Sequence, residues 1–171
     1  MNQLTIFRIL SFVLIPFAAL FGLLDILIIL SALANPAFLL FAFILAAFVI
    51  YTFASLKFLT KGIDISRPCK PSLRDWIRVN AYVSTFMGVT FLMNALSIFF
   101  TSDVILRQYL SHFLETQPNV PTILTLDLFL TIMKGMAWFM FVLSLALLTH
   151  IQLNFRLLKK YRFLFEAGSQ E

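Results

Sequence analysis

The chain has 171 residues, of which 61% are hydrophobic and only 12% are charged. A water-soluble domain carries about 25% charged residues, so this composition leaves too little polar surface to face water. The 13 Lys and Arg residues outnumber the 8 Asp and Glu residues. This excess does not indicate a nucleic-acid partner, because a nucleic-acid binder concentrates its charge on a water-facing surface. The composition therefore predicts an integral membrane protein whose solvent is the lipid bilayer.

Four apolar windows are long enough to cross a bilayer, for which a helix needs about 20 residues. The predicted spans cover residues 4–33, 37–59, 73–100 and 122–148. Asn35 and Pro36 separate the first two spans, because proline disfavours a helical conformation in the residue before it but suits the first turn of the next helix. We therefore expect an all-α fold, a polytopic four-helix transmembrane bundle that forms one domain over residues 1–171.

The segments around the third span carry two further signals. Ser72 and Asp75 have the spacing of a capping box, which predicts the start of the third helix. Residues 103–115 place apolar and polar side chains on opposite helix faces but are too few to cross a bilayer. They predict an extra amphipathic helix that lies along the outer interface of the membrane between spans three and four. Pro118 and Pro121 are expected to end this helix.

The basic residues are distributed unevenly between the two ends of the predicted spans. One side carries Arg8, six Lys and Arg residues around the loop between spans two and three, and four in the tail over residues 155–171. The other side carries Arg107 alone. Because Lys and Arg flank membrane spans mainly on the cytoplasmic side, we expect both termini in the cytoplasm. We expect the protein to reside in the cell membrane, specifically a bacterial inner membrane.

The same basic flanks are suited to acidic lipid headgroups, since each Lys or Arg near an anionic membrane surface contributes about 1 kcal/mol. The residues expected to contact headgroups are Lys61, Arg67, Lys70, Arg74, Arg156, Lys159, Lys160 and Arg162. Ordinary topology signals explain the same pattern without a specific lipid site. Both interpretations remain open at the level of sequence.

Several polar side chains fall inside the predicted spans, where a charge costs about 2.5–3.5 kcal/mol. We expect them to form one intramembrane polar cluster of Asp25, Asn94, Asp127 and Lys134. Asp25 is the expected partner of Lys134, because helical side chains lean toward the helix N-terminus and these two helices run in opposite directions. Three roles are open for the cluster: fixing helix order and register, forming a proton or ion path, and contacting the membrane helix of a partner.

Few residues in the sequence are suited to catalysis or metal binding. Cys69 is the single cysteine, which excludes an internal disulfide. His112 and His150 are expected on opposite sides of the membrane, each as an interfacial polar residue, so we expect no metal site and no cofactor. A membrane-embedded enzyme would have to use His150 with Asn154 and Arg156, and this group lacks a positioned nucleophile.

These observations favour a non-enzymatic accessory or assembly partner of a membrane complex. Its expected contacts are the lipid bilayer and either another membrane protein or a second copy of this chain. The lack of a catalytic motif and the short loops support this hypothesis. A small oligomeric channel or transporter that uses the Asp/Lys cluster is the second hypothesis, and a membrane-embedded enzyme is the third.

Overall fold

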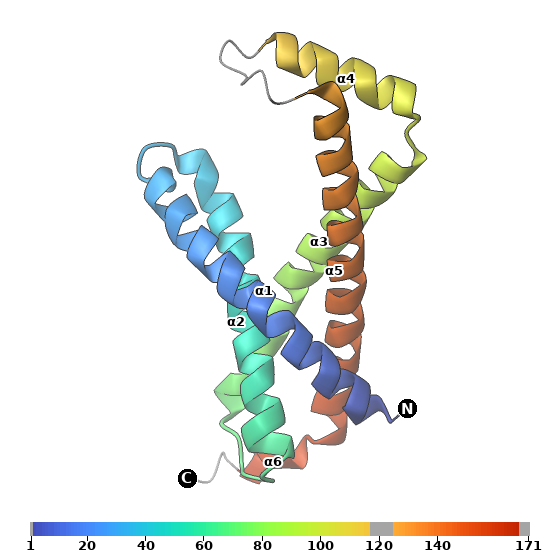
Figure 1. The fold of residues 1–171 in the computed structure, drawn as a ribbon. Coiled ribbons are helices and arrows are strands. Elements are labelled where there is room, and N and C mark those ends of the chain that lie inside the picture. Colours follow the sequence, from blue (N-terminus) through green and yellow to red (C-terminus); the bar gives the residue numbers. More distant parts are fainter. Residues whose placement is uncertain (1, 117–124, 168–171) are drawn as a thin grey trace. The chain divides into compact units, whose positions relative to one another are not determined.

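The computed structural model describes residues 2–116 and 125–167, and every regular element in these two ranges is helical (Figure 1). The long helices are α1 (Gln3–Ala32), α2 (Leu39–Lys57), α3 (Pro71–Phe100) and α5 (Leu126–Lys160). The short elements are the 3-10 turn η1 (Pro36–Phe38), the π-helical turn η2 (Phe58–Ile63), α4 (Asp103–Glu115) and α6 (Phe163–Ala167). Among the described residues, four helical segments are long and apolar enough to cross a membrane: α1, η1–α2–η2, α3 and α5.

The residues at the starts of two helical segments explain where these segments begin. Asn35 accepts a hydrogen bond from the Ala37 N–H through its side-chain oxygen at 3.0 Å, which opens the helical segment after the tight turn. Helix α3 begins at Pro71, one residue before Ser72. Ser72 therefore lies in the first turn instead of at the N-cap, and among the described residues it forms no capping box with Asp75. Proline at the first helical position explains this earlier start, since its missing N–H has no partner there in any case.

The second helical segment is longer than predicted, because the π-helical turn η2 continues it to Ile63. We expected a loop from Thr60 onward; the loop begins at Asp64. The turn η2 buries Phe58 and Leu59, and its extension beyond the predicted end also buries Ile63. Removing these apolar side chains from solvent favours the continued helix over a loop.

Helix α5 also continues beyond its predicted end, from Leu148 to Lys160. The added turns bury Ile151, Leu157 and Leu158, so packing maintains the helix after its outward face has become polar. The predicted start of this span at residue 122 lies outside the described residues, as do Pro118, Pro121 and the end of the predicted tail, residues 168–171.

The chain divides into two compact units, which we call unit 1 (residues 1–87 and 146–171) and unit 2 (residues 88–145). In unit 1, α1 and α2 pack along one another. Helix α6 is held in this unit by two contacts. The Phe58 and Phe165 rings stack with their centroids 5.4 Å apart. The Cys69 N–H donates to the Leu164 carbonyl oxygen at 2.8 Å.

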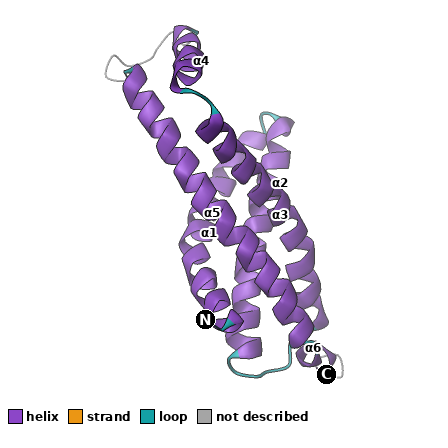
Figure 2. Ribbon diagram, turned by 90° about the vertical axis from the view of Figure 1, so that its right-hand side faces the viewer, coloured by secondary structure: helices purple, strands orange, loops and turns teal. Residues whose placement is uncertain are grey.

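Unit 2 contains the end of α3, all of α4 and the beginning of α5. The ring of Phe99 packs against Trp138 and Phe141, with centroid separations of 4.8 and 5.7 Å. Helix α4 covers Asp103–Glu115, which are the bounds predicted from its amphipathic pattern. Figure 2 shows α4 as a separate helix joined to α3 by a short loop.

Candidate functional site

Five polar side chains from three helices form a hydrogen-bond network buried in unit 1. The Ser11 Oγ of α1 lies 2.9 Å from His150 Nε2, and the Tyr51 hydroxyl of α2 lies 2.7 Å from His150 Nδ1. Asn154 Nδ2 donates to the Tyr51 hydroxyl oxygen at 3.3 Å and to Ser55 Oγ at 2.8 Å. None of the five residues is more than 2% exposed. We call them the His150 network.

The donors and acceptors of the network determine the state of the imidazole. Ser11 Oγ donates its proton to the Phe7 carbonyl oxygen at 2.8 Å, so toward His150 it acts as an acceptor and Nε2 carries the hydrogen. Nδ1 is then the acceptor of the Tyr51 proton, which makes the imidazole neutral. The Phe7 ring stacks on the imidazole at 4.6 Å between centroids. A neutral, fully bonded histidine is compatible with an apolar interior.

The His150 network connects α1, α2 and α5 by side-chain hydrogen bonds. Ser11 and His150 are the residue types of a nucleophile and its general base, but such a base must accept the hydroxyl proton. Here the proton of Ser11 points to a backbone carbonyl and His150 donates. In this arrangement His150 does not act as a base toward Ser11, and the hydrogen bonds of the network join α1, α2 and α5. One acceptor, Asn154 Oδ1, is buried without a hydrogen-bond partner among the described residues.

The network differs from the sequence-based expectation for His150. We expected an interfacial side chain, whereas packing against Phe7 and Tyr51 leaves it fully buried. Arg156, which we grouped with it, is exposed. The residues that sequence reasoning missed are Ser11, Tyr51 and Ser55. For Tyr51 and Ser55 a signal was present, because these two residues, like His150 and Asn154, are a polar pair four residues apart and therefore share a helix face.

In unit 2, two ion pairs hold α4 on the beginning of α5. Lys134 Nζ donates to both carboxylate oxygens of Asp103, at 2.7 and 2.8 Å. The Arg107 guanidinium lies 2.6 Å from an Asp127 carboxylate oxygen. The side chains of these four residues are between 43% and 77% exposed. They therefore form an accessible clamp between two helices.

The structure places the four residues of the predicted intramembrane cluster in different surroundings. Lys134 bonds to Asp103, where we expected Asp25, because α4 follows α3 directly and brings its acidic first turn to α5. Asp127 pairs with Arg107 in the same way. Asp25 belongs to unit 1, is 7% exposed, and has one carboxylate oxygen without a hydrogen-bond partner among the described residues.

Asn94, the fourth member, belongs to a polar stripe on α3 in unit 2. Thr90, Asn94 and Ser97 are spaced four and three residues apart, so they share one helix face. All three are exposed, and their side chains make no hydrogen bond within the described part of the chain. Thr101 extends the stripe and donates to the Ser97 carbonyl oxygen at 2.7 Å. We call Thr90, Asn94 and Ser97 the α3 stripe.

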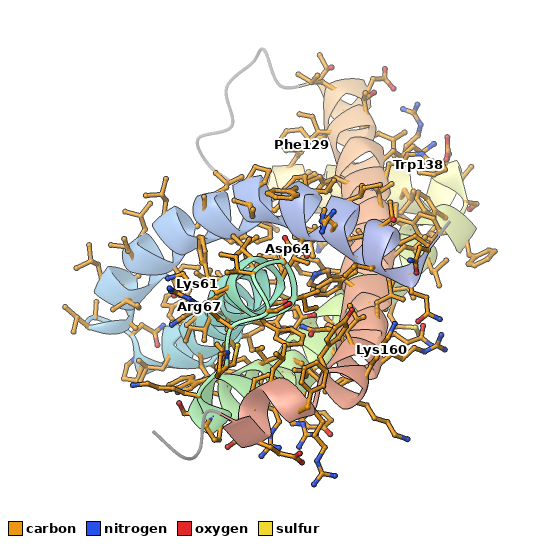
Figure 3. The ribbon with its side chains drawn as sticks, turned by 90° about the horizontal axis from the view of Figure 1, so that it is seen from below. Lys61, Asp64, Arg67, Phe129, Trp138 and Lys160 are labelled. Atoms are coloured by element: carbon orange, nitrogen blue, oxygen red, sulfur yellow. The ribbon has the colours of Figure 1, made fainter. Side chains whose placement is uncertain are left out.

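The residues expected to meet lipid headgroups fall into two groups. Lys61, Arg67 and Lys70 line one pocket of unit 1, and Figure 3 labels the first two close together. The other members lie outside this pocket: Arg74, which pairs with Asp75 at 3.5 Å; Arg162, which pairs with Glu166 at 2.7 Å; and the exposed Arg156, Lys159 and Lys160. Lys61, Arg67 and Lys70 thus form one concentrated basic site, whereas the other five residues are scattered.

We compared the chain with protein-family models, with curated proteins and with solved structures, and none of them matches it.

Proposed function

We propose that this protein is a multi-pass membrane protein that works without catalysis, as an accessory or assembly partner of another membrane protein. In this proposal α1, η1–α2–η2, α3 and α5 cross the bilayer as a bundle, with both termini in the cytoplasm of a bacterial cell. The length and apolar character of the four segments support the insertion. The uneven distribution of Lys and Arg supports the orientation.

The α3 stripe is the observation that carries the partner assignment. In hydrocarbon, the Thr90 hydroxyl, the Asn94 amide and the Ser97 hydroxyl have no water to bond with, so leaving them exposed to lipid is unfavourable. A second membrane helix that offers Ser, Thr, Asn or Gln side chains at matching spacing would satisfy them. The proposed occupant is therefore such a helix in a different protein.

The size of the expected effect follows from measured hydrogen bonds between membrane helices. Each contributes about 0.6 kcal/mol on average and at most about 1.7 kcal/mol. Asn94→Leu is therefore expected to weaken the complex by about threefold to eighteenfold. If the stripe faced lipid, the same substitution would leave association unchanged, since leucine suits hydrocarbon better than asparagine.

Site-specific photo-crosslinking in intact membranes tests the proposal. A photoreactive amino acid at Asn94 or Ser97 is expected to give an adduct with one heterologous membrane protein, identified by mass spectrometry. Val89, which is exposed and lies about 100° around α3 from Thr90, is the matched control position. Adducts with lipid alone at all three positions would refute a docking surface, and adducts with a second copy of this chain would refute a heterologous partner.

A small oligomeric channel or transporter is the second candidate, and Asp25 is the observation that favours it. A buried carboxylate in a membrane helix with an unpartnered oxygen is typical of an ion or proton path. Flux measured in proteoliposomes is expected to fall in Asp25→Asn if this candidate is correct. Unchanged flux in that variant would remove Asp25 from the path.

A further inference from the structure

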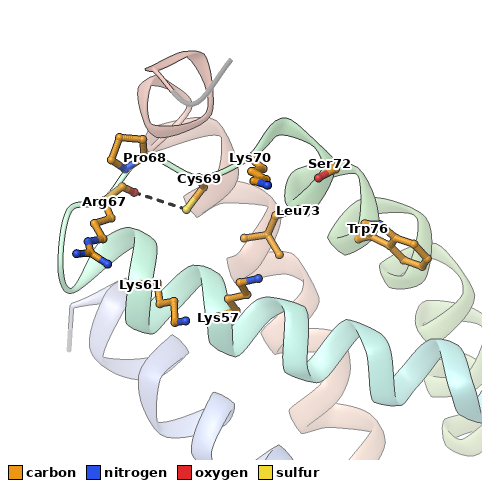
Figure 4. A pocket seen from close by; sticks show the side chains of 9 residues that line it. All are labelled: Lys57, Lys61, Arg67, Pro68, Cys69, Lys70, Ser72, Leu73 and Trp76. Carbon is orange, nitrogen blue, oxygen red and sulfur yellow. Dashed lines mark hydrogen bonds between the residues drawn. The ribbon is translucent and has the colours of Figure 1, made fainter. Parts of the chain in front are cut away.

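A pocket of about 450 Å³ opens in unit 1 between the π-helical turn η2, the loop that follows it and the start of α3 (Figure 4). Its walls are Lys57, Lys61, Arg67, Pro68, Cys69, Lys70, Ser72, Leu73 and Trp76. We call it the basic pocket. Its charge, its rigid frame and the apolar groove next to it each restrict what it can bind.

Four of the nine lining residues are cationic and none is acidic. The two acidic residues nearest in sequence already have partners: Asp64 pairs with Arg8 at 2.6 Å and Asp75 pairs with Arg74 at 3.5 Å. Within the described residues, none of the four cations in the pocket forms an ion pair. The basic pocket therefore holds four positive charges that pair with no carboxylate of residues 2–116 and 125–167, which favours an anion with several acceptor oxygens.

The frame of the pocket is held by packing around Cys69, which is 6% exposed. The thiol donates to the Arg67 carbonyl oxygen at 3.6 Å, and the Cys69 N–H bonds to α6. A Cβ atom on Gly62 would meet the Cys69 sulfur at 3.0 Å and the Phe58 ring at 3.1 Å, so the loop lies directly on the π-helical turn. The Lys and Arg side chains thus extend from a fixed backbone, as preorganised binding requires.

A shallow apolar groove continues from the basic pocket along α3. The groove has a volume of about 310 Å³. It shares Ser72 and Trp76 with the basic pocket, and its other lining residues are Val79 and Asp75, whose carboxylate pairs with Arg74. Trp76 and Val79 are both more than half exposed. Tryptophan is enriched where the headgroup region meets hydrocarbon, so a charged pocket beside an exposed Trp and Val matches a molecule that is anionic at one end and apolar at the other.

We propose that the basic pocket binds the phosphate of an anionic phospholipid, with the start of an acyl chain lying against Trp76 and Val79. The lysines and Arg67 contact the phosphate oxygens, and the N-terminal end of α3 adds its partial positive charge. A soluble phosphate would share the first part of this recognition but would not use the groove. The site concerns unit 1 alone and does not depend on the partner proposed for the α3 stripe.

Fluorescence quenching by brominated lipids tests the proposal on the full chain. In a Trp138→Phe background, Trp76 is the one remaining tryptophan, since the chain has two. Brominated phosphatidylglycerol is expected to quench Trp76 at lower mole fraction than brominated phosphatidylcholine. Each basic residue near an anionic surface contributes about a fivefold preference, so Lys57→Gln with Lys61→Gln is expected to reduce the preference by up to about 25-fold.

The matched control is Lys159→Gln with Lys160→Gln, which removes the same charge from exposed positions outside the pocket. We expect Lys159 and Lys160 to contact other headgroups, but quenching of Trp76 reports lipid held beside the pocket. This control is therefore expected to reduce the lipid preference far less than the pocket variant does. An equal loss in both double variants, or no preference in the parent, would overturn the proposal. Inorganic phosphate is the second probe. If it protects the parent but not the pocket variant from thermal unfolding, while neither lipid is preferred, the phosphate site stands and the lipid assignment is overturned.

Discussion

The His150 network makes Tyr51→Phe an informative perturbation. The substitution removes one oxygen atom and leaves the apolar ring in place. That oxygen bonds to His150 Nδ1 at 2.7 Å and to Asn154 Nδ2 at 3.3 Å, so two buried groups lose a partner. Water cannot replace it easily, because none of the three residues is more than 1% exposed.

The expected loss of stability follows from these two unpaired groups. A buried donor or acceptor left without a partner costs about 1–3 kcal/mol. With two such groups, Tyr51→Phe is therefore expected to lower the free energy of unfolding by about 2–6 kcal/mol. The matched control is Tyr82→Phe, which removes the same atom from a side chain that is 68% exposed. Exposed substitutions of this kind usually change stability by less than about 0.5 kcal/mol.

Equilibrium unfolding in mixed micelles, followed by circular dichroism, measures the difference. A double-mutant cycle with Asn154→Leu adds a second criterion, because removing the amide removes one of the groups that Tyr51→Phe leaves unpaired. The two substitutions are expected to be non-additive by about 1 kcal/mol. If Tyr51→Phe costs no more than Tyr82→Phe, or if the cycle is additive, the network described here does not stabilise the protein.

Three further predictions concern single residues. Lys134→Met removes one of the two ion pairs that hold α4, so hydrogen exchange in α4 is expected to accelerate. Global stability should change by only about 0.2–1 kcal/mol, because the pair is exposed. Unchanged hydrogen exchange in α4 would contradict the clamp. Gly62→Ala is expected to cost about 1–3 kcal/mol in thermal unfolding, since its Cβ would meet Cys69 and a ring, while Gly135→Ala meets nothing within 4 Å and should be tolerated. Burial raises the pKa of the Cys69 thiol, an effect that Lys57 partly offsets. The folded state therefore holds this proton more tightly than the unfolded state, and the free energy of unfolding should fall as the pH rises through the thiol range. Maleimide labelling of Cys69 at neutral pH should be slow until the protein unfolds.

Much of the helical framework could be predicted from local sequence. Long apolar windows predict helices because in lipid every backbone polar group must bond within its own segment. The bounds of α4 followed from periodicity alone, since apolar side chains must share one face of a short helix. The second and fourth spans were predicted to end several residues before η2 and α5 end in the structure. Charges mark where an apolar span ends, but burial of residues such as Leu157 allows the helix to continue.

Tertiary structure decided which side chains meet. Helical spacing places Asp127 and Lys134 on one face of α5, yet it contains no information about the residue opposite, and their partners come from α4. His150 is polar in sequence and buried in the fold because Ser11 and Tyr51 complete its hydrogen bonds from two other helices. The spacing of polar and apolar residues predicts which side chains share a helix face. Hydrogen-bond partners depend on how separate helices pack, and this packing is determined by residues throughout the chain.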